Sequence, residues 1–298
     1  MPNSIDPTLC FAPLVRWAAA THTNKRLVLA LDPTLLTDRF RVLCVAVLAG
    51  GGGLPVAWAV QTADQKGAWN PIGFDLLGRL RAALGDGWTV LVLTDRGLES
   101  PALVREIVRL GWHPLMRVKA GGHFRPAGWH RGWRMNGFAS GVGRRWAGEG
   151  LAYPTGERLP CTLLASWDDG HAEPWLLLTD LPVGGASAGW YAWRMWIEQG
   201  FRAIKRGCWG WHKTQMTDPD RVARLWAVLA VATLYATEVG GATTPADVPP
   251  VGRRLGRLKR GLLLLWLALL WRQPIPTGRI DHPAWTLDPR PSHSTKPN

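Results

Sequence analysis

The sequence is short of acidic residues. Asp and Glu total 22 against 35 Lys and Arg, which gives a formal net charge of +13 at pH 7. Only 7 of the 35 basic residues are Lys, so arginine carries most of the positive charge. A chain with this charge attracts polyanions, and nucleic acid is the simplest polyanionic partner. The charge balance therefore favours a nucleic-acid-binding role.

Cysteine and long apolar runs are also scarce. The four cysteines, Cys10, Cys44, Cys161 and Cys208, show no Cys-x-x-Cys pair and no His spacing typical of a zinc site. This pattern fits a reducing cytosol, and the first residues lack the charged start and apolar core of a signal peptide. The strongest apolar run, Leu262–Trp271, is half the roughly 20 residues of a membrane helix. We therefore expect a buried helix there, no membrane partner, and a cytoplasmic, nucleoid-associated protein.

The first half of the chain has the pattern of a mixed α/β sheet. Apolar runs predict strands at 26–32, 41–49, 54–61, 88–95 and 112–118. Helical spacing at 68–84, and at 101–110 with Ser100 as its N-cap, predicts two helices. The glycines at 50–53 predict a hairpin turn, because a strand and no helix follows them. Three antiparallel strands, a helix, and two strands joined by a helix form a ribonuclease-H-like layout.

An acid-free segment follows. No Asp or Glu occurs between Ile107 and Gly148, where arginines alternate with tryptophans, among them Trp112, Trp129, Trp133 and Trp146. Basic and aromatic side chains in alternation suit phosphate neutralisation and stacking on unpaired bases. A glycine-rich loop whose tryptophans pack on the domain explains the same composition equally well. The segment then becomes apolar and strand-like, at 161–167 and 175–179, which predicts a β-rich insertion.

The run from Trp190 to Lys205 has the most informative spacing. At about 100° per residue of an α-helix, Tyr191, Arg194, Glu198 and Lys205 fall within an arc of about 60°, with Arg202 beside it. One carboxylate among phosphate-binding partners suits an acid that holds a metal ion on a nucleic-acid backbone. A further helix is expected at 218–238, capped by Asp218 with Pro219 at its first position.

The spacing Tyr-x2-Arg-x3-Glu-x6-Lys resembles the YREK motif of DDE transposases from bacterial insertion sequences of family four. The flanks of two acids extend the resemblance: Leu31-Asp32-Pro33-Thr34 resembles the first-Asp motif and Thr94-Asp95-Arg96-Gly97 the second. Pro33 departs from the glycine usual in that family. The resemblance covers roughly residues 26 to 240.

Three carboxylates are the candidate catalytic and metal-binding residues. We expect Asp32 to end the first strand, Asp95 to follow the fourth, and Glu198 to reach them from the later helix. In a ribonuclease-H-like sheet the first and fourth strands are neighbours, so these side chains would converge. Oxygen ligands suit Mg²⁺ or Mn²⁺, and two such ions can activate a water or a 3′-hydroxyl while stabilising the leaving oxygen.

The resemblance implies an enzyme that cuts DNA at the ends of a mobile element and joins the exposed 3′-hydroxyl to target DNA. It implies DNA contacts at Tyr191, Arg194, Arg202 and Lys205, and a homodimer when two ends are synapsed. In relatives with a β-rich insertion, a tryptophan there stacks on a flipped base. The candidates here are Trp129, Trp133 and Trp146.

The expected organisation has five parts. They are a leader at 1–25, a catalytic core at 26–118 and 181–240, an insertion at 119–180, a basic helical segment at 241–273, and a disordered tail at 274–298. The leader is shorter than the DNA-binding region usual in the family. Two other interpretations therefore stay open: a truncated, non-catalytic DNA-binding remnant, and another ribonuclease-H-like nuclease such as a structure-specific resolvase.

Overall fold

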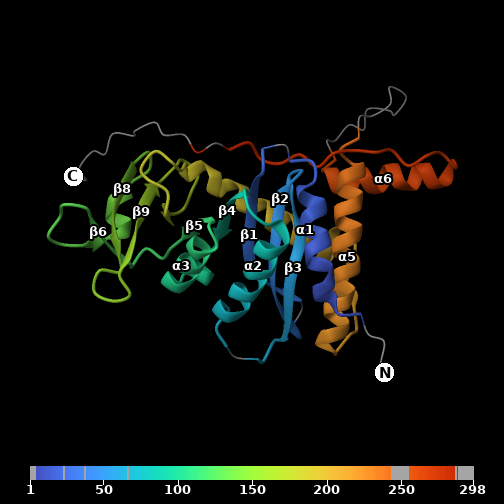
Figure 1. Cartoon of the computed structure of the whole chain (residues 1–298), viewed down its shortest axis with the longest axis horizontal. Coiled ribbons are helices and arrows are strands. Elements are labelled where there is room, and N and C mark those ends of the chain that lie inside the picture. Colours follow the sequence, from blue (N-terminus) through green and yellow to red (C-terminus); the bar gives the residue numbers. More distant parts are fainter. Residues whose placement is uncertain are drawn as a thin grey trace. The chain divides into compact units, whose positions relative to one another are not determined.

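The chain forms two compact units in a computed structural model that describes residues 5–22, 24–36, 38–65, 67–242, 255–285 and 287 (Figure 1). The first unit contains residues 1–68, 75–88 and 195–283. The second contains residues 69–74, 89–194 and 284–298. Each unit is therefore assembled from segments that are far apart in the sequence.

The first unit is built on three antiparallel strands. These are β1 (Arg26–Leu36), β2 (Phe40–Ala49) and β3 (Gly52–Thr62), in the order β3-β2-β1. Most of their side chains are buried, β2 almost completely. The predicted hairpin joins β2 to β3, and Gly50 and Gly51 adopt φ of 60° and 76°, a conformation that glycine reaches without strain.

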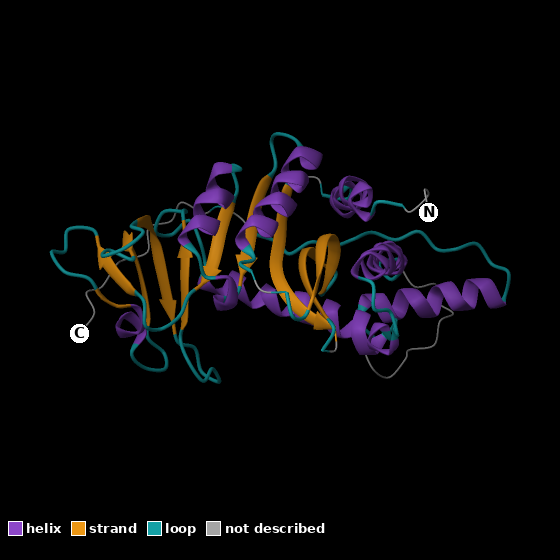
Figure 2. Cartoon of the chain, turned by 90° about the horizontal axis from the view of Figure 1, so that it is seen from below, coloured by secondary structure: helices purple, strands orange, loops and turns teal. Residues whose placement is uncertain are grey.

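Helices pack on both faces of the strands (Figure 2). They are α1 (Phe11–Ala19), α2 (Asn70–Leu84), α4 (Met195–Arg202) and α5 (Pro219–Val239), whereas α6 (Arg257–Leu270) packs on α5. Helix α1 was not expected from the leader, yet it buries Phe11, Leu14 and Val15. The buried positions of α1 do recur at helical spacing, but the last two are Ala18 and Ala19, whose small side chains give only a weak apolar signal in the sequence.

Helix α5 begins as predicted, with the Asp218 carboxylate accepting a hydrogen bond from the Asp220 amide and Pro219 in the first turn. It is also the one helix in the described part of the chain that is long and apolar enough to cross a membrane, and 50% of its most apolar window is buried inside the protein. Its buried side includes Trp226, Ala230 and Leu234, whereas Val228 is 63% exposed.

The second unit contains a mixed sheet. Its elements are β4 (Thr89–Thr94), α3 (Pro101–Arg109), β5 (His113–Arg117), β6 (His123–Pro126), β7 (Trp133–Arg134), β8 (Arg145–Ala152), β9 (Leu159–Ser166) and β10 (Trp175–Thr179). The strand order is β4-β5-β10-β9-β8-β6-β7, with β4 and β5 parallel and the later pairs antiparallel. This confirms the predicted mixed α/β class, flanked by helices and with a β-rich insertion before α4.

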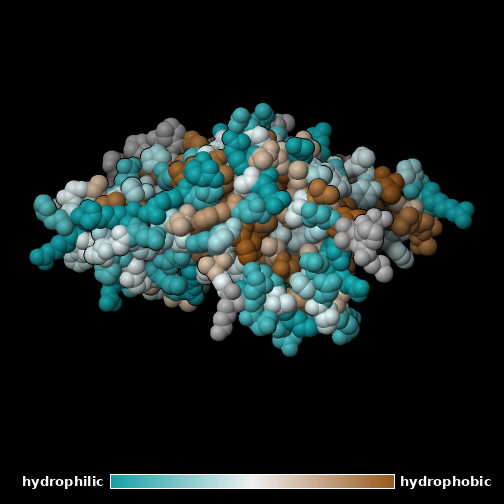
Figure 3. Space-filling view, turned by 60° about the horizontal axis from the view of Figure 1, so that its bottom comes forward, coloured by the Kyte–Doolittle hydropathy of each residue, from teal (hydrophilic) through white to brown (hydrophobic). Residues whose placement is uncertain are grey.

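Two expectations about the C-terminal segments need correction. Helix α6 is not buried as a whole: Leu264 and Ala268 are buried, whereas Trp266 and Leu269 are 59% and 72% exposed. Hydrophobic side chains are visible where α6 lies at the right of Figure 3. Two positions of the expected disordered tail, Ile280 and Trp285, are buried. Residue 286, residues 288–298 and the proline-rich stretch 244–250 lie outside the described residues.

The segment after α6 packs through a histidine pair. The rings of His22 and His282 have centroids 4.3 Å apart. Burial, followed by the charge of His22, lowers the pKa of His282 to about 4. The Thr21 hydroxyl donates to the Ile280 carbonyl at 2.8 Å and ties the same segment to the end of α1. The neutral form of His282 therefore stabilises this packing.

We expect this packing to make stability depend on pH between about 6.5 and 4. Because the folded-state pKa of His282 lies below its unfolded value, its contribution is complete above about pH 6.5 and falls as the pH drops towards about 4. Thermal unfolding followed by circular dichroism should show a smaller decline over this range for His282→Gln than for the native chain. The exposed His130→Gln is the control. Equal declines in all three proteins would contradict the assignment.

Candidate active site

Asp95 lies where the sequence predicts, directly after the buried strand β4. Its backbone is extended, and its Oδ1 accepts a hydrogen bond from the Arg96 amide at 2.7 Å. This bond caps a short 3₁₀ turn at Arg96–Leu98. The side chain is 32% exposed. The turn thus fixes the orientation of a partly solvated carboxylate at the carboxyl end of β4.

The first half of the YREK motif contacts this carboxylate and the residue before it. The Arg194 guanidinium lies 3.4 Å from Asp95 Oδ2, and its side chain is only 11% exposed. The Tyr191 hydroxyl donates to the Thr94 carbonyl at 3.4 Å, and Tyr191 is buried. Two motif segments almost a hundred residues apart therefore meet at Asp95. Arg194 balances the Asp95 charge where water is partly excluded, which strengthens the pairing.

Asp32 lies within β1 and not at its end, contrary to our expectation. The strand continues to Leu36, with Asp32 opposite Cys44 in β2. Pro33 does not stop the strand, because its extended backbone suits a β conformation. Asp32 is 6% exposed, so water screens its charge only weakly and the charge acts strongly on neighbouring groups. Burial and this carboxylate raise the pKa of the Cys44 thiol well above its usual value.

Lys205 is the cationic neighbour of Asp32 in the first unit. Burial, with a contribution from Arg206, lowers the pKa of Lys205, and the Asp32 carboxylate opposes this shift. Arg202, beside Lys205 in the motif, is exposed. Within the first unit the charges of Asp32 and Lys205 therefore interact, and Arg202 is accessible to solvent.

The motif does not form the single α-helix that the spacing predicts. Its helical segments are a 3₁₀ helix at Ala188–Arg194, α4, and a π-helical turn at Ala203–Gly207. In the π turn the Cys208 amide donates to the Ala203 carbonyl at 2.7 Å. Because residues per turn differ among these helix types, the four motif side chains do not share the arc calculated from 100° per residue.

Glu198 is carried by α4, which packs unusually close to β3. A Cβ atom on Gly200 would lie 2.5 Å from the Gly53 carbonyl oxygen, and one on Gly53 would lie 2.8 Å from the Ile197 Cα. Neither position has room for a side chain. The two glycines therefore set the distance between α4 and β3, and with it the position of the half-buried Glu198 in the first unit.

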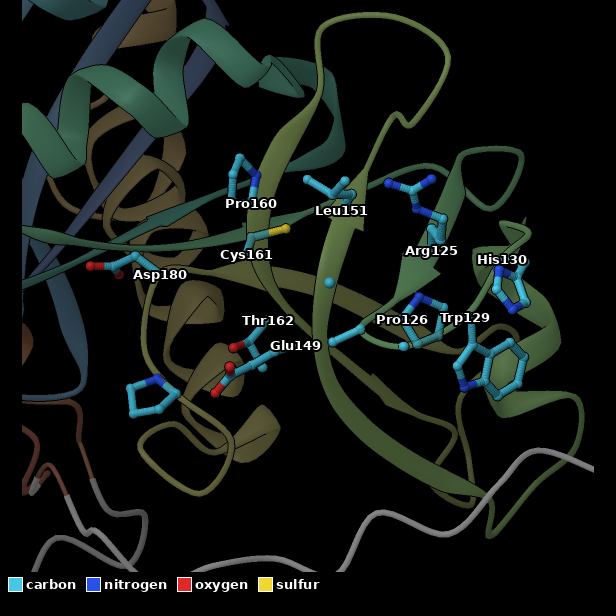
Figure 4. Close-up of a pocket in the computed structure, with 14 residues that line it drawn as sticks. Arg125, Pro126, Trp129, His130, Glu149, Leu151, Pro160, Cys161, Thr162 and Asp180 are labelled. Atoms are coloured by element: carbon cyan, nitrogen blue, oxygen red, sulfur yellow. The ribbon is translucent and has the colours of Figure 1, made fainter.

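The predicted stacking tryptophans have different environments. Trp129 and Trp133 form an edge-to-face pair with ring centroids 6.3 Å apart, and Trp133 is 57% exposed. Trp129 also lines a cavity of about 900 Å³ together with Arg125 and His130 (Figure 4). Trp146 is buried instead, with its ring centroid 4.3 Å from that of Phe138. Of these three tryptophans, only Trp129 and Trp133 present a ring that a ligand could reach without disrupting the core of the unit.

Sequence reasoning missed a set of hydrogen bonds that hold the loop after β4. Glu99 accepts from the Tyr153 hydroxyl at 2.6 Å and from the Lys119 amide at 2.8 Å. Burial, reinforced by Glu99, raises the pKa of Tyr153. Glu99 thus ties the loop that carries Asp95 to the start of the adjoining β-rich region, at Lys119, and to the connection between β8 and β9, at Tyr153. The signal available in the sequence was that Glu99 lies four residues after Asp95, but Glu99 belongs to neither of the recognised motifs.

The donor chemistry of the three predicted acids suits a hard divalent cation. Asp32, Asp95 and Glu198 offer only oxygen ligands, the type that Mg²⁺ and Mn²⁺ prefer. No cluster of three His, Cys, Asp or Glu side chains that could hold a metal ion occurs among the described residues. Asp32 and Glu198 belong to the first unit and Asp95 to the second. A cation at Asp95 competes with Arg194 for the same carboxylate.

We expect Gly200→Ala to displace α4 and Glu198. The added methyl group meets the Gly53 backbone, so the change should lower the free energy of unfolding by about 1–3 kcal/mol. Chemical denaturation measures this loss. Gly78→Ala in α2 is the matched control, because its added Cβ has open space and a helical Ala is favoured over Gly. A Gly200→Ala variant as stable as the native chain would contradict the close packing of α4 on β3.

Comparison with known proteins identifies the family. The family model described as "Transposase DDE domain" matches residues 23–235, which include all three acids and the YREK motif. Among solved structures, a piggyBac transposase synaptic complex with hairpin DNA matches with a TM-score of 0.41 at 10% identity, over 82% of this chain and 53% of that one. The chain thus spans about half the length of that transposase.

Human ENDOV matches with a TM-score of 0.27 at 11% identity, over 72% of this chain and 88% of that one. No curated protein matches the sequence. The family match covers most of the chain. The chain belongs to the transposase DDE domain family.

Proposed function

We propose that the chain is the catalytic part of a transposase that cuts DNA at the ends of an insertion sequence and transfers the exposed 3′-hydroxyl to target DNA. The family relationship supports transposition in general. The YREK spacing supports the narrower assignment to insertion sequences of family four. Double-stranded DNA, as element end and as target, is the proposed partner.

One observation carries the proposal. The Arg194–Asp95 ion pair and the Tyr191–Thr94 hydrogen bond join the YREK motif to the second acidic motif. A chance set of polar residues on a surface helix has no reason to contact the carboxyl end of a buried strand. The contact is what the proposed site requires, because the cationic motif must lie next to the acids that act on a phosphodiester.

Asp32, Asp95 and Glu198 would hold two Mg²⁺ or Mn²⁺ ions. When bound, such ions activate the attacking oxygen and stabilise the leaving one, so the protein needs no nucleophile of its own. The carboxylates bind and orient these ions. Asp32 and Arg194 each have low exposure, so water screens their charges less than it screens the charges of surface groups.

The basic residues of the motif would hold the DNA. Arg202 is exposed and free to reach a phosphate, while Lys205 presents its charge beside Asp32. We propose Trp129 and Trp133 as stacking residues for an unpaired base near the cut end, since their rings are accessible. Two copies of the chain would act together when two element ends are paired.

The test is cleavage of a labelled duplex that carries the inverted repeat of the element, with Mg²⁺ or Mn²⁺. Glu198→Gln keeps the size of the side chain and removes its charge. We expect the native chain to nick the duplex only with metal, and Glu198→Gln to lose about 100-fold or more of the rate. Glu106→Gln on α3, whose carboxylate pairs with Arg109 at the surface, should cut normally.

Three results would contradict the proposal. Metal-independent binding with no cleavage by any variant would favour a DNA-binding remnant. Cleavage that survives Glu198→Gln would assign the chemistry to another site. Cleavage of branched DNA in preference to the repeat duplex would instead favour a structure-specific nuclease.

A further inference from the structure

A second carboxylate–guanidinium contact lies beside Asp95. Glu173 Oε1 accepts a hydrogen bond from Arg96 at 2.7 Å and another from Arg117 at 2.8 Å. Two guanidinium groups therefore converge on one oxygen atom, and the three side chains together carry a net positive charge. Neither motif contains Glu173 or Arg117, and the proposed chemistry uses neither of them.

The fold places the two arginines next to the proposed site. Strands β4 and β5 are parallel, with Thr94 opposite Met116, so the residues that follow leave the same edge of the sheet. Arg96 comes directly after Asp95, and Arg117 is the last residue of β5. The Arg117 side chain is 18% exposed and is held in place by packing, whereas that of Arg96 is 48% exposed.

Glu173 is attached less firmly than its partners. It lies in the exposed loop between β9 and β10, and its side chain is 45% exposed. Salt bridges at this exposure contribute little to stability, because water and salt screen them. The carboxylate can therefore leave the arginines without opening the core of the unit.

We propose that Arg96 and Arg117 form a binding site for a phosphate of the DNA backbone, which Glu173 occupies in the free protein. A phosphate oxygen can accept from the same two guanidinium groups that now share Glu173 Oε1, because both are planar donors suited to oxyanions. DNA then has to displace Glu173. The site lies one residue from Asp95, and this inference rests on the proposed action on DNA.

The test is the affinity for a duplex of arbitrary sequence, measured by fluorescence anisotropy in EDTA so that cleavage plays no part. Glu173→Gln removes the competing charge, and we expect it to tighten binding about three- to tenfold. Glu157→Gln is the matched control, because it changes the net charge equally and Glu157 pairs with Arg105 on the surface of the same unit. Affinity gained through net charge alone would appear in both variants.

The arginines make the test specific. In a chain with both Arg96→Gln and Arg117→Gln, Glu173→Gln should give no gain beyond that of Glu157→Gln. These two arginine changes should also lower the slope of log affinity against log salt by about one to two units. Thermal unfolding of each variant verifies that the unit stays folded.

The outcomes separate this inference from the proposed function. If the chain binds DNA and Glu173→Gln matches Glu157→Gln, or weakens binding, the inference is wrong and the proposed function stands. A gain that persists without the two arginines overturns the inference as well. If no variant binds DNA, the proposed function fails and this inference fails with it.

Discussion

The pairing of carboxylates with guanidinium groups around Asp95 is the interaction on which the account of this protein depends. Arg194 neutralises Asp95, and Arg96 shares Glu173 with Arg117. A chain with a formal charge of +13 concentrates some of its few acids at this point. The same cations that stabilise these acids in the free protein are the groups expected to bind phosphate. Under the proposed function, binding of DNA and metal would be an exchange of partners: arginines would move from carboxylates to phosphates, and carboxylates would become available to cations.

The fold is compatible with such an exchange, because it fixes the backbone of the Asp95 loop and of α4, whereas the ion pairs are made by side chains. The Asp95 carboxylate is held through the Arg96 amide at the end of a buried strand, while Glu99 ties the same loop to Tyr153 and Lys119. In the first unit, the contact of Gly200 with Gly53 sets the position of α4. Backbone contacts of this kind do not depend on the bound ligand, so the acids keep their places when the ion pairs around them change.

The sequence predicted most elements of the sheet and the candidate acids, because buried strands, capped helices and the YREK spacing leave local patterns. It failed where the outcome depends on tertiary contacts. The motif runs through three helix types, since Tyr191 and Arg194 are held by the β4 segment while Gly200 holds α4 against β3. Trp129 and Trp146 both lie in the same basic, acid-free segment of the sequence, yet Trp146 is buried in the structure and Trp129 is only half-buried. Glu173 gave no signal, because its partners are distant in the sequence.

The central proposal is that Asp32, Asp95 and Glu198 bind metal together. The most direct measurement replaces Mg²⁺ with Fe²⁺ in the DNA-bound chain and maps where hydroxyl radicals, generated at the iron, cut the polypeptide. The account predicts cuts close to all three residues, each abolished by excess Mg²⁺. Cuts near only one or two of them, or cuts that Mg²⁺ does not suppress, would contradict a shared site.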